Sequence, residues 1–121
     1  MNDWIKALNF IRLIDDDFSY SNEKNFIKLC KKHFNEIPDS LNKKISKNEY
    51  SKIIQKINES DTDPRTLIYL MIEISLINLS IHEGILKIIK ETASSLNISN
   101  KDYDLILEIS GLKTVILQKD L

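Results

Sequence analysis

The sequence predicts an all-α protein, and three observations carry that prediction. The 121 residues include only two glycines and two prolines, too few to form the turns between several short strands. Leucine, isoleucine and lysine are abundant, and the apolar residues recur at helical spacing. We therefore expect one domain over residues 1–121, built as a single compact bundle of six or seven helices.

The first three helices follow from spacing and capping residues. Trp4, Leu8 and Ile11 recur at i, i+4 and i+7, which predicts a helix from Asp3 to Ile14. Ser21 is the expected N-cap of a second helix, which Pro38 should stop. Its predicted apolar face consists of Phe26, Ile27, Cys30, Phe34 and Ile37. A capping box at residues 46–49 predicts a third helix, whose apolar residues are Tyr50, Ile53, Ile54 and Ile57.

A fourth helix should be the buried centre of the bundle. Asp63 and Pro64 form a typical helix start, in which proline occupies the first helical position. From Leu67 to Ile77 almost every residue is apolar. Such a helix is expected to be contacted on most of its circumference rather than along one stripe, and it should extend to Asn78.

Two further helices and a tail complete the chain. A second capping box at residues 80–83 opens a fifth helix, with Asn97 as its C-cap. Ser99 begins a sixth helix, with Tyr103, Ile106 and Ile109 facing inward, which should close before Gly111. Residues 112–117 are rich in β-formers but have no partner strand, so we expect the C-terminal tail to be a packed arm or a short helix.

The two halves of the chain resemble each other at an offset of 59 residues. This offset places Ser21 on Ser80 (80 − 21 = 59), Leu8 on Leu67 and Cys30 on Ile89, among others. Chance matches are common in a chain rich in isoleucine and leucine. Together with the capping pattern, the offset predicts two related helical hairpins around the central helix.

The second half resembles the tellurite-resistance TerB-like family. Residues 61–106 are similar to that family's pattern of an acidic-Pro-Arg helix start, a long apolar helix, a turn, and an early glutamate in the next helix. Residues 9–34 are similar to the same turn, with Asp15 to Asp17 standing where the family usually carries Asp-Gly. The resemblance implies a non-catalytic module linked to tellurite or chemical-stress response and to multi-protein assemblies.

Asp15, Asp16, Asp17 and Glu23 are the only candidate metal ligands. A calcium loop that begins at Asp15 would need glycine at its sixth position and a bidentate carboxylate at its twelfth. The sequence has Tyr20 and Phe26 there. An EF-hand is therefore rejected, and we expect a solvated acidic turn that binds Ca²⁺ or another divalent cation weakly at most.

Composition excludes several other classes of function. The net charge of −1 gives no global attraction to nucleic acid, and the one basic cluster reads as a solvated helix face: Lys43, Lys44, Lys47, Lys52 and Lys56. The apolar run from Leu67 to Ile81 is shorter than the roughly 20 residues that span a bilayer, so no membrane insertion is expected. His33 and His82 match no zinc spacing.

A cytoplasmic interaction module is therefore the predicted function. No catalytic motif is present, and the single cysteine, Cys30, is expected to be a core residue in a reducing compartment. The sequence predicts a protein partner without naming it, requires no cofactor and leaves homo-oligomers open. Two alternatives remain: a weak divalent-cation binder at the acidic turn, and an immunity or antitoxin-like protein that masks a toxin.

Overall fold

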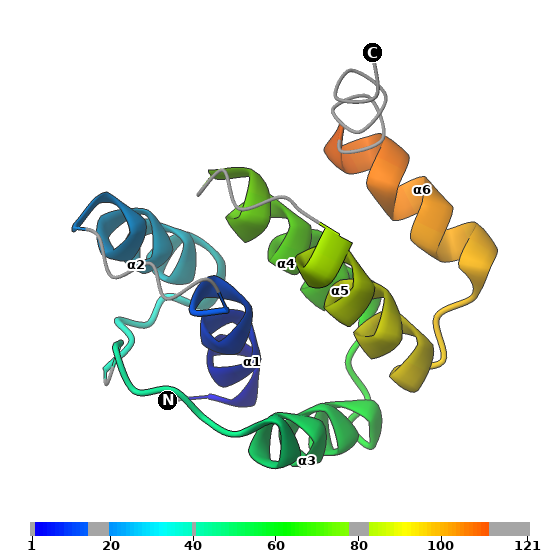
Figure 1. Ribbon diagram of the computed structural model, residues 1–121, viewed down its shortest axis with the longest axis horizontal. Helices are drawn as coiled ribbons and strands as arrows, with labels where there is room; N and C mark the ends of the chain where they lie inside the picture. The colour runs from blue at the N-terminus through cyan, green and yellow to red at the C-terminus, as the bar shows by residue number, and fades with distance from the viewer. Residues whose placement is uncertain (1, 15–19, 40, 78–82, 112–121) are drawn as a thin grey trace.

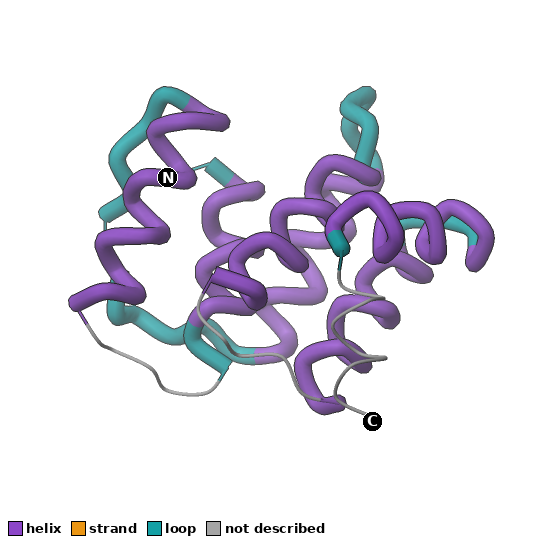
Figure 2. Tube along the Cα trace, turned by 90° about the horizontal axis from the view of Figure 1, so that it is seen from above, coloured by secondary structure: helices purple, strands orange, loops and turns teal. Residues whose placement is uncertain are grey.

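The computed structural model describes residues 2–14, 20–39, 41–77 and 83–111, and these ranges contain helices and loops but no strand (Figures 1 and 2). The predicted all-α helical bundle is confirmed. The helices are α1 (Asp3–Arg12), α2 (Tyr20–Phe34), α3 (Lys47–Asn58), α4 (Arg65–Ile77), α5 (Glu83–Ser95) and α6 (Asn100–Ser110).

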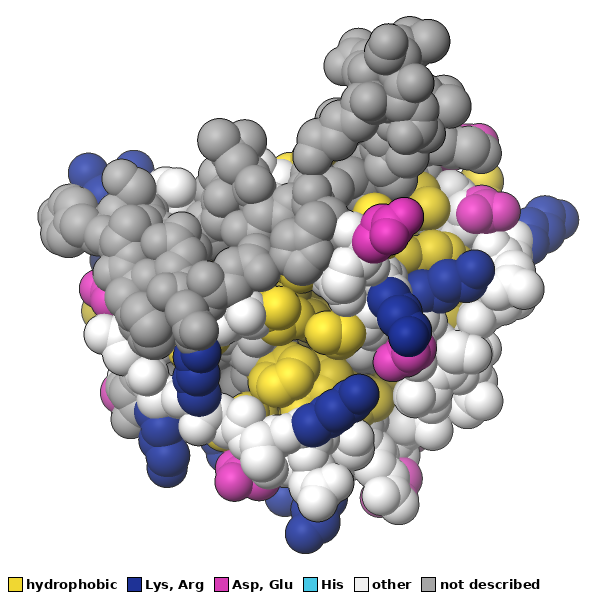
Figure 3. Space-filling model, viewed as in Figure 1, with side chains coloured by type: hydrophobic (Ala, Val, Ile, Leu, Met, Phe, Trp, Pro, Cys, Tyr) yellow, Lys and Arg dark blue, Asp and Glu magenta, His cyan; other side chains and the backbone are white. Residues whose placement is uncertain are grey.

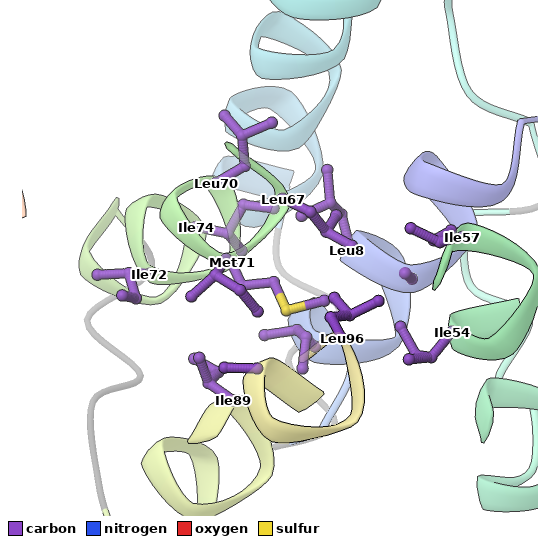
Figure 4. Close-up of a cluster of buried hydrophobic side chains, with 14 of the residues drawn as sticks. Leu8, Ile54, Ile57, Leu67, Leu70, Met71, Ile72, Ile74, Ile89 and Leu96 are labelled. Atoms are coloured by element: carbon purple, nitrogen blue, oxygen red, sulfur yellow. The ribbon is translucent and has the colours of Figure 1, made fainter. Parts of the chain in front are cut away.

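Helix α4 is the centre of the bundle, as its composition predicts. It contacts α1, α5 and α6, and Figure 1 shows it lying among them. Its buried residues point in several directions around the helix, and they are Leu67, Ile68, Leu70, Met71, Ile72, Ile74 and Ser75. Figure 4 shows Met71 directed toward Leu96, with Leu8 of α1 and Ile54 of α3 nearby. Burial on most sides makes α4 the main source of hydrophobic stabilisation.

Hydrogen bonds confirm the predicted capping roles of Ser46, Asp63, Asn97 and Ser99. The hydroxyls of Ser46 and Ser99 accept from the backbone N–H three residues later, each at 3.1 Å. The Asp63 carboxylate accepts from the N–H of Arg65 at 3.0 Å, so α4 begins one residue after Pro64. Helix α5 ends in a Schellman motif: Asn97 is left-handed at φ 61°, and the N–H of the next residue donates to the Ala93 carbonyl at 3.0 Å.

The predicted limits of the first two helices are wrong at three places. Helix α1 ends at Arg12 rather than Ile14. Ser21 is not an N-cap, because α2 already includes it, and a cap residue needs non-helical backbone. Helix α2 stops at Phe34, since Asn35 adopts a left-handed φ of 51°. Ile37 therefore lies beyond the helix and is 66% exposed instead of completing the apolar face.

A second correction concerns the inner face of α6. Tyr103 and Ile106 are buried as predicted, but Ile109 is 73% exposed. Each step of three residues turns only about 300° around a helix, so Ile109 lies about 120° away from Tyr103. Three residues at i, i+3 and i+6 therefore cannot share a narrow buried stripe.

The two predicted hairpins are joined in different ways. Helices α4 and α5 pack directly against each other. Helix α2 is attached to α1 through side chains: Trp4 and Phe34 meet edge to face with ring centroids 6.1 Å apart, and the guanidinium carbon of Arg12 lies 5.2 Å from the centre of the Phe26 ring.

Three sequence predictions fall outside the described residues. They concern the acidic turn at Asp15 to Asp17, the Ser80 cap and the tail at residues 112–121. Among the described helices, none is long and apolar enough to cross a membrane.

Candidate interaction groove

A groove of about 660 Å³ opens between α1, α3 and the loop that precedes α3. Helix α1 and helix α3 form two of its walls, and the loop forms the third. The lining residues are Lys6, Asn9, Phe10, Leu13 and Ile14 of α1 and its end, Asp39, Lys43, Lys44 and Ile45 of the loop, and Glu49, Lys52, Ile53 and Lys56 of α3.

The spacing of these residues explains why they line the same groove. Those of α1 and its end fall at i, i+3, i+4, i+7 and i+8, and those of α3 at i, i+3, i+4 and i+7. Both series trace a single helix face. The two helices contact each other, and together they leave an apolar floor that includes Phe10, Leu13 and Ile53 between charged edges.

A buried polar cluster fixes the loop wall of the groove. Arg12 is only 3% exposed, and its guanidinium donates to the Leu41 carbonyl and to the side-chain oxygen of Asn9, the latter at 2.8 Å. The Asn9 amide also donates to the Leu41 carbonyl at 3.3 Å. Hydrogen bonds from a buried charged donor hold geometry strongly, so α1 sets the position of the chain just before Lys43 and Lys44.

The groove is positively charged although the chain is not. Among the described residues that line it are five lysines and two carboxylates, a formal charge of +3 (5 − 2 = 3), whereas the whole chain carries −1. Within the described ranges, no carboxylate forms an ion pair with Lys6, Lys43, Lys52 or Lys56. The cationic character of the groove is therefore local, and it attracts anionic groups.

A second, smaller hollow of about 370 Å³ lies between α3 and α5, and Phe10 lines both hollows. The Phe10 and Tyr50 rings stack with centroids 4.0 Å apart. Thr92 donates its hydroxyl proton to the Ile88 carbonyl at 2.9 Å, so its oxygen accepts from Tyr50 at 2.7 Å. Burial raises the pKa of Tyr50 to about 12. This hydroxyl is therefore a structural donor at neutral pH.

Figure 3 shows hydrophobic side chains exposed in the middle of the face where α1, α3 and α5 meet in Figure 1. Basic and acidic side chains both border this apolar area. An apolar centre within a charged rim is the usual composition of a protein-binding surface.

Of the residues that the sequence singled out as metal ligands, the structure describes only Glu23. Asp15, Asp16 and Asp17 lie outside the described residues, and Glu23 lies in the first turn of α2. In the described ranges, no three His, Cys, Asp or Glu side chains come together as a metal site. Cys30 is fully buried, and burial raises its pKa to about 12, so its thiol is unreactive at neutral pH.

The predicted lysine cluster is exposed but has a more specific setting than a solvated helix face. Four of its five members line the large groove, and Lys47 lines the smaller hollow. Sequence reasoning missed Lys6 and Phe10 of the facing helix. Their i, i+4 spacing was the available signal, but it could not reveal which helix lies opposite.

One polar contact lies away from the groove. The Nε2 atom of His33 lies 3.9 Å from the Oε2 atom of Glu73, which links α2 to α4. That buried oxygen has no hydrogen-bond partner within the described chain. The contact is too long for a hydrogen bond, and it defines no ligand site.

Comparison with protein-family models, curated proteins and solved structures finds no match to this chain. The TerB-like resemblance therefore stays a hypothesis that depends on the sequence motifs alone.

Proposed function

We propose that this protein is a non-catalytic interaction module that binds a protein partner in the groove between α1 and α3. The observation that carries the proposal is the combination of an open apolar floor with a rim of opposite charge to the chain. Polar contacts from Arg12 hold the loop wall in place, which reduces the ordering cost of binding.

The TerB-like resemblance of residues 61–106 supplies the biological setting of this proposal. It links the module to tellurite or chemical-stress response and to a cytoplasmic multi-protein assembly. In an immunity or antitoxin-like role, the protein would bind a toxin in the same groove. The groove serves either role, because both need a surface that complements another protein.

Affinity purification from the native host tests the groove as the binding site. Three baits are compared: the wild type, a Lys52→Glu/Lys56→Glu variant, and a Lys87→Glu/Lys90→Glu variant. The second pair is exposed on α5 and lies outside the groove, and it changes the net charge equally. We expect mass spectrometry to find a protein that the wild type and the α5 variant retain and the groove variant loses.

The recovered protein is then purified and titrated against the same three baits. A partner that binds all three with equal affinity would place the binding surface elsewhere and refute the proposed function. Circular dichroism melts of each variant confirm that exposed lysine substitutions leave the fold intact.

A further inference from the structure

We infer that the groove receives an amphipathic helix whose apolar stripe is flanked by aspartate or glutamate. This inference rests on the proposed function and adds the chemistry of the partner. Its first support is charge complementarity: the lining residues that the structure describes carry a formal charge of +3. A basic segment would be repelled by the same lysines, so the groove discriminates by sign as well as by shape.

The distribution of the lysines favours charges on both sides of an apolar stripe. They come from three separate elements around one floor: Lys6 from α1, Lys43 and Lys44 from the loop, and Lys52 and Lys56 from α3. Lys52 and Lys56 are four residues apart on one helix, which places their stems roughly 6 Å from each other. Carboxylates at i and i+4 of a partner helix have the same spacing.

The floor matches a helix better than a flat or thin ligand. From Lys6 to its end at Arg12, α1 advances six residues, which is roughly 9 Å, and Leu13 and Ile14 extend this wall just past the helix. Apolar anchors at i, i+3 or i+4, and i+7 of a partner helix cover the same length. The aliphatic floor includes Leu13, Ile45 and Ile53, which suit leucine or isoleucine side chains.

Single-stranded nucleic acid, the other common polyanion, fits this floor poorly. Binding of bases without sequence preference depends on aromatic platforms. Among the lining residues that the structure describes, Phe10 is the one aromatic residue, and one face of its ring already stacks on Tyr50 at 4.0 Å. The remaining lining residues are aliphatic, amide or charged.

Selection from a phage-displayed library of helical peptides of about 16 residues tests the inference without a known partner. One face of each peptide is randomised, and the wild type and the Lys52→Glu/Lys56→Glu variant are used as separate targets. We expect wild-type binders to combine a leucine or isoleucine stripe with flanking acidic residues. We expect the variant to select fewer acidic residues.

The strongest acidic peptide is then measured by fluorescence polarisation. We expect the Kd to rise at least about tenfold for the groove variant, to change less than about twofold for Lys87→Glu/Lys90→Glu, and to weaken with added salt. RNA and poly-glutamate serve as probes that lack an apolar stripe. They should bind the wild type far more weakly than the peptide does.

Each outcome bears on one proposal or on both. Neutral or basic binders that the groove variant loses would overturn the acidic-helix inference and leave the groove as a binding site. RNA or poly-glutamate binding as tight as that of the peptide would also overturn it, since charge alone would then suffice. Selected binders that both targets hold equally, or no enrichment of any peptide, would count against the inference and the groove together.

Discussion

Helices α1 and α4 lie against each other in the core, and they fill that core with different chemistry. The 59-residue offset places Asn9 on Ile68 (9 + 59 = 68) and Arg12 on Met71 (12 + 59 = 71). All four side chains are buried. At equivalent places, therefore, the first half of the chain buries an amide and a guanidinium where the second half buries two apolar side chains.

The difference shows how a buried charged side chain can hold a surface loop in position. In α4 the buried side chains are apolar apart from Ser75, whose hydroxyl donates to the Met71 carbonyl at 3.0 Å within the same helix. In α1 the polar pair donates outward to the Leu41 carbonyl. The apolar half thus contributes mainly stability, whereas the polar half also positions a wall of the groove.

The largest predicted effect is that of Ile74→Asp in the apolar half. Ile74 is 2% exposed, so the substitution buries a carboxylate with no partner in an apolar setting. Its desolvation costs several kcal/mol against a total stability of about 5 to 15 kcal/mol. We expect loss of cooperative thermal unfolding, measured by circular dichroism.

The matched control is Ile109→Asp on the exposed side of α6. Ile109 is 73% exposed, so the same chemical change should shift the free energy of unfolding by no more than about 0.5 kcal/mol. If Ile74→Asp kept a near-native midpoint, α4 would not be the centre of the core.

The second prediction concerns Arg12, which is replaced by the residue type found at the equivalent position of α4. Arg12→Met introduces the residue found at the equivalent place in α4, with similar length and without the guanidinium. The Leu41 carbonyl and the Asn9 oxygen each lose a charged donor, which should cost about 2 to 3 kcal/mol in a urea titration. Amides near residues 41–45 should also exchange hydrogen faster than in the wild type.

Met71→Leu provides the comparison in the apolar half. It conserves volume in a fully buried position, so it should cost less than about 1.5 kcal/mol and leave exchange in the loop unchanged. Equal effects of the two substitutions would mean that the polar cluster does not hold the groove wall.

A third prediction concerns the contact between α3 and α5. Tyr50→Phe removes the hydroxyl that donates to Thr92, which should cost about 1 kcal/mol at pH 7. The substitution should also change how the free energy of unfolding depends on pH in alkaline solution. Below pH 10 the tyrosine is protonated in both states, and between pH 10 and about 12 the unfolded chain loses its proton first.

Tyr50 therefore contributes stability that is present below pH 10 and is lost as the pH rises to about 12. A rise of this size in the pKa of Tyr50 corresponds to a contribution of roughly 2 to 3 kcal/mol to the free energy of unfolding. Urea midpoints between pH 9 and 12 should fall more steeply for the wild type than for Tyr50→Phe. Parallel curves would mean that the Tyr50 hydroxyl is accessible to water in the folded protein.

Local signals were enough to predict most of the helices. Ser46, Ser99 and Asn97 act through bonds to residues within five positions, so their sequence context already contains the interaction. The end of α2 was predicted too late because Pro38 is the stronger stop signal in sequence. The left-handed backbone of Asn35, which stops the helix earlier, is a weaker signal.

The groove could be predicted only in part. The sequence showed that Lys52 and Lys56 share a face, but it could not show that Lys6 and Phe10 lie opposite them across an apolar floor. That juxtaposition is tertiary, because it depends on how α1 packs on α3. The buried state of Arg12 was equally hidden, since its partner carbonyl at Leu41 is 29 residues away.

The smallest predicted effect concerns the segment between α1 and α2, which contains Asp15 to Asp17, whereas the segment between α4 and α5 contains Asn78 and Leu79. In a calcium loop that began at Asp15, the sixth residue would need positive φ. Tyr20 instead begins α2 and is helical.

We predict that the acidic turn binds Ca²⁺ or Zn²⁺ no more tightly than about millimolar, because calcium requires six to eight oxygen ligands. The twelfth position, which should supply two of them, is Phe26, buried beneath the Arg12 guanidinium at 5.2 Å. Glu23 could add one carboxylate to the three aspartates, but without the bidentate ligand at position twelve part of the shell would have to come from water or backbone carbonyls. Calorimetry on the wild type and on an Asp15→Asn/Asp16→Asn/Asp17→Asn variant should give indistinguishable, near-zero heats. Micromolar binding that the triple substitution removes would instead make this chain a cation-binding protein.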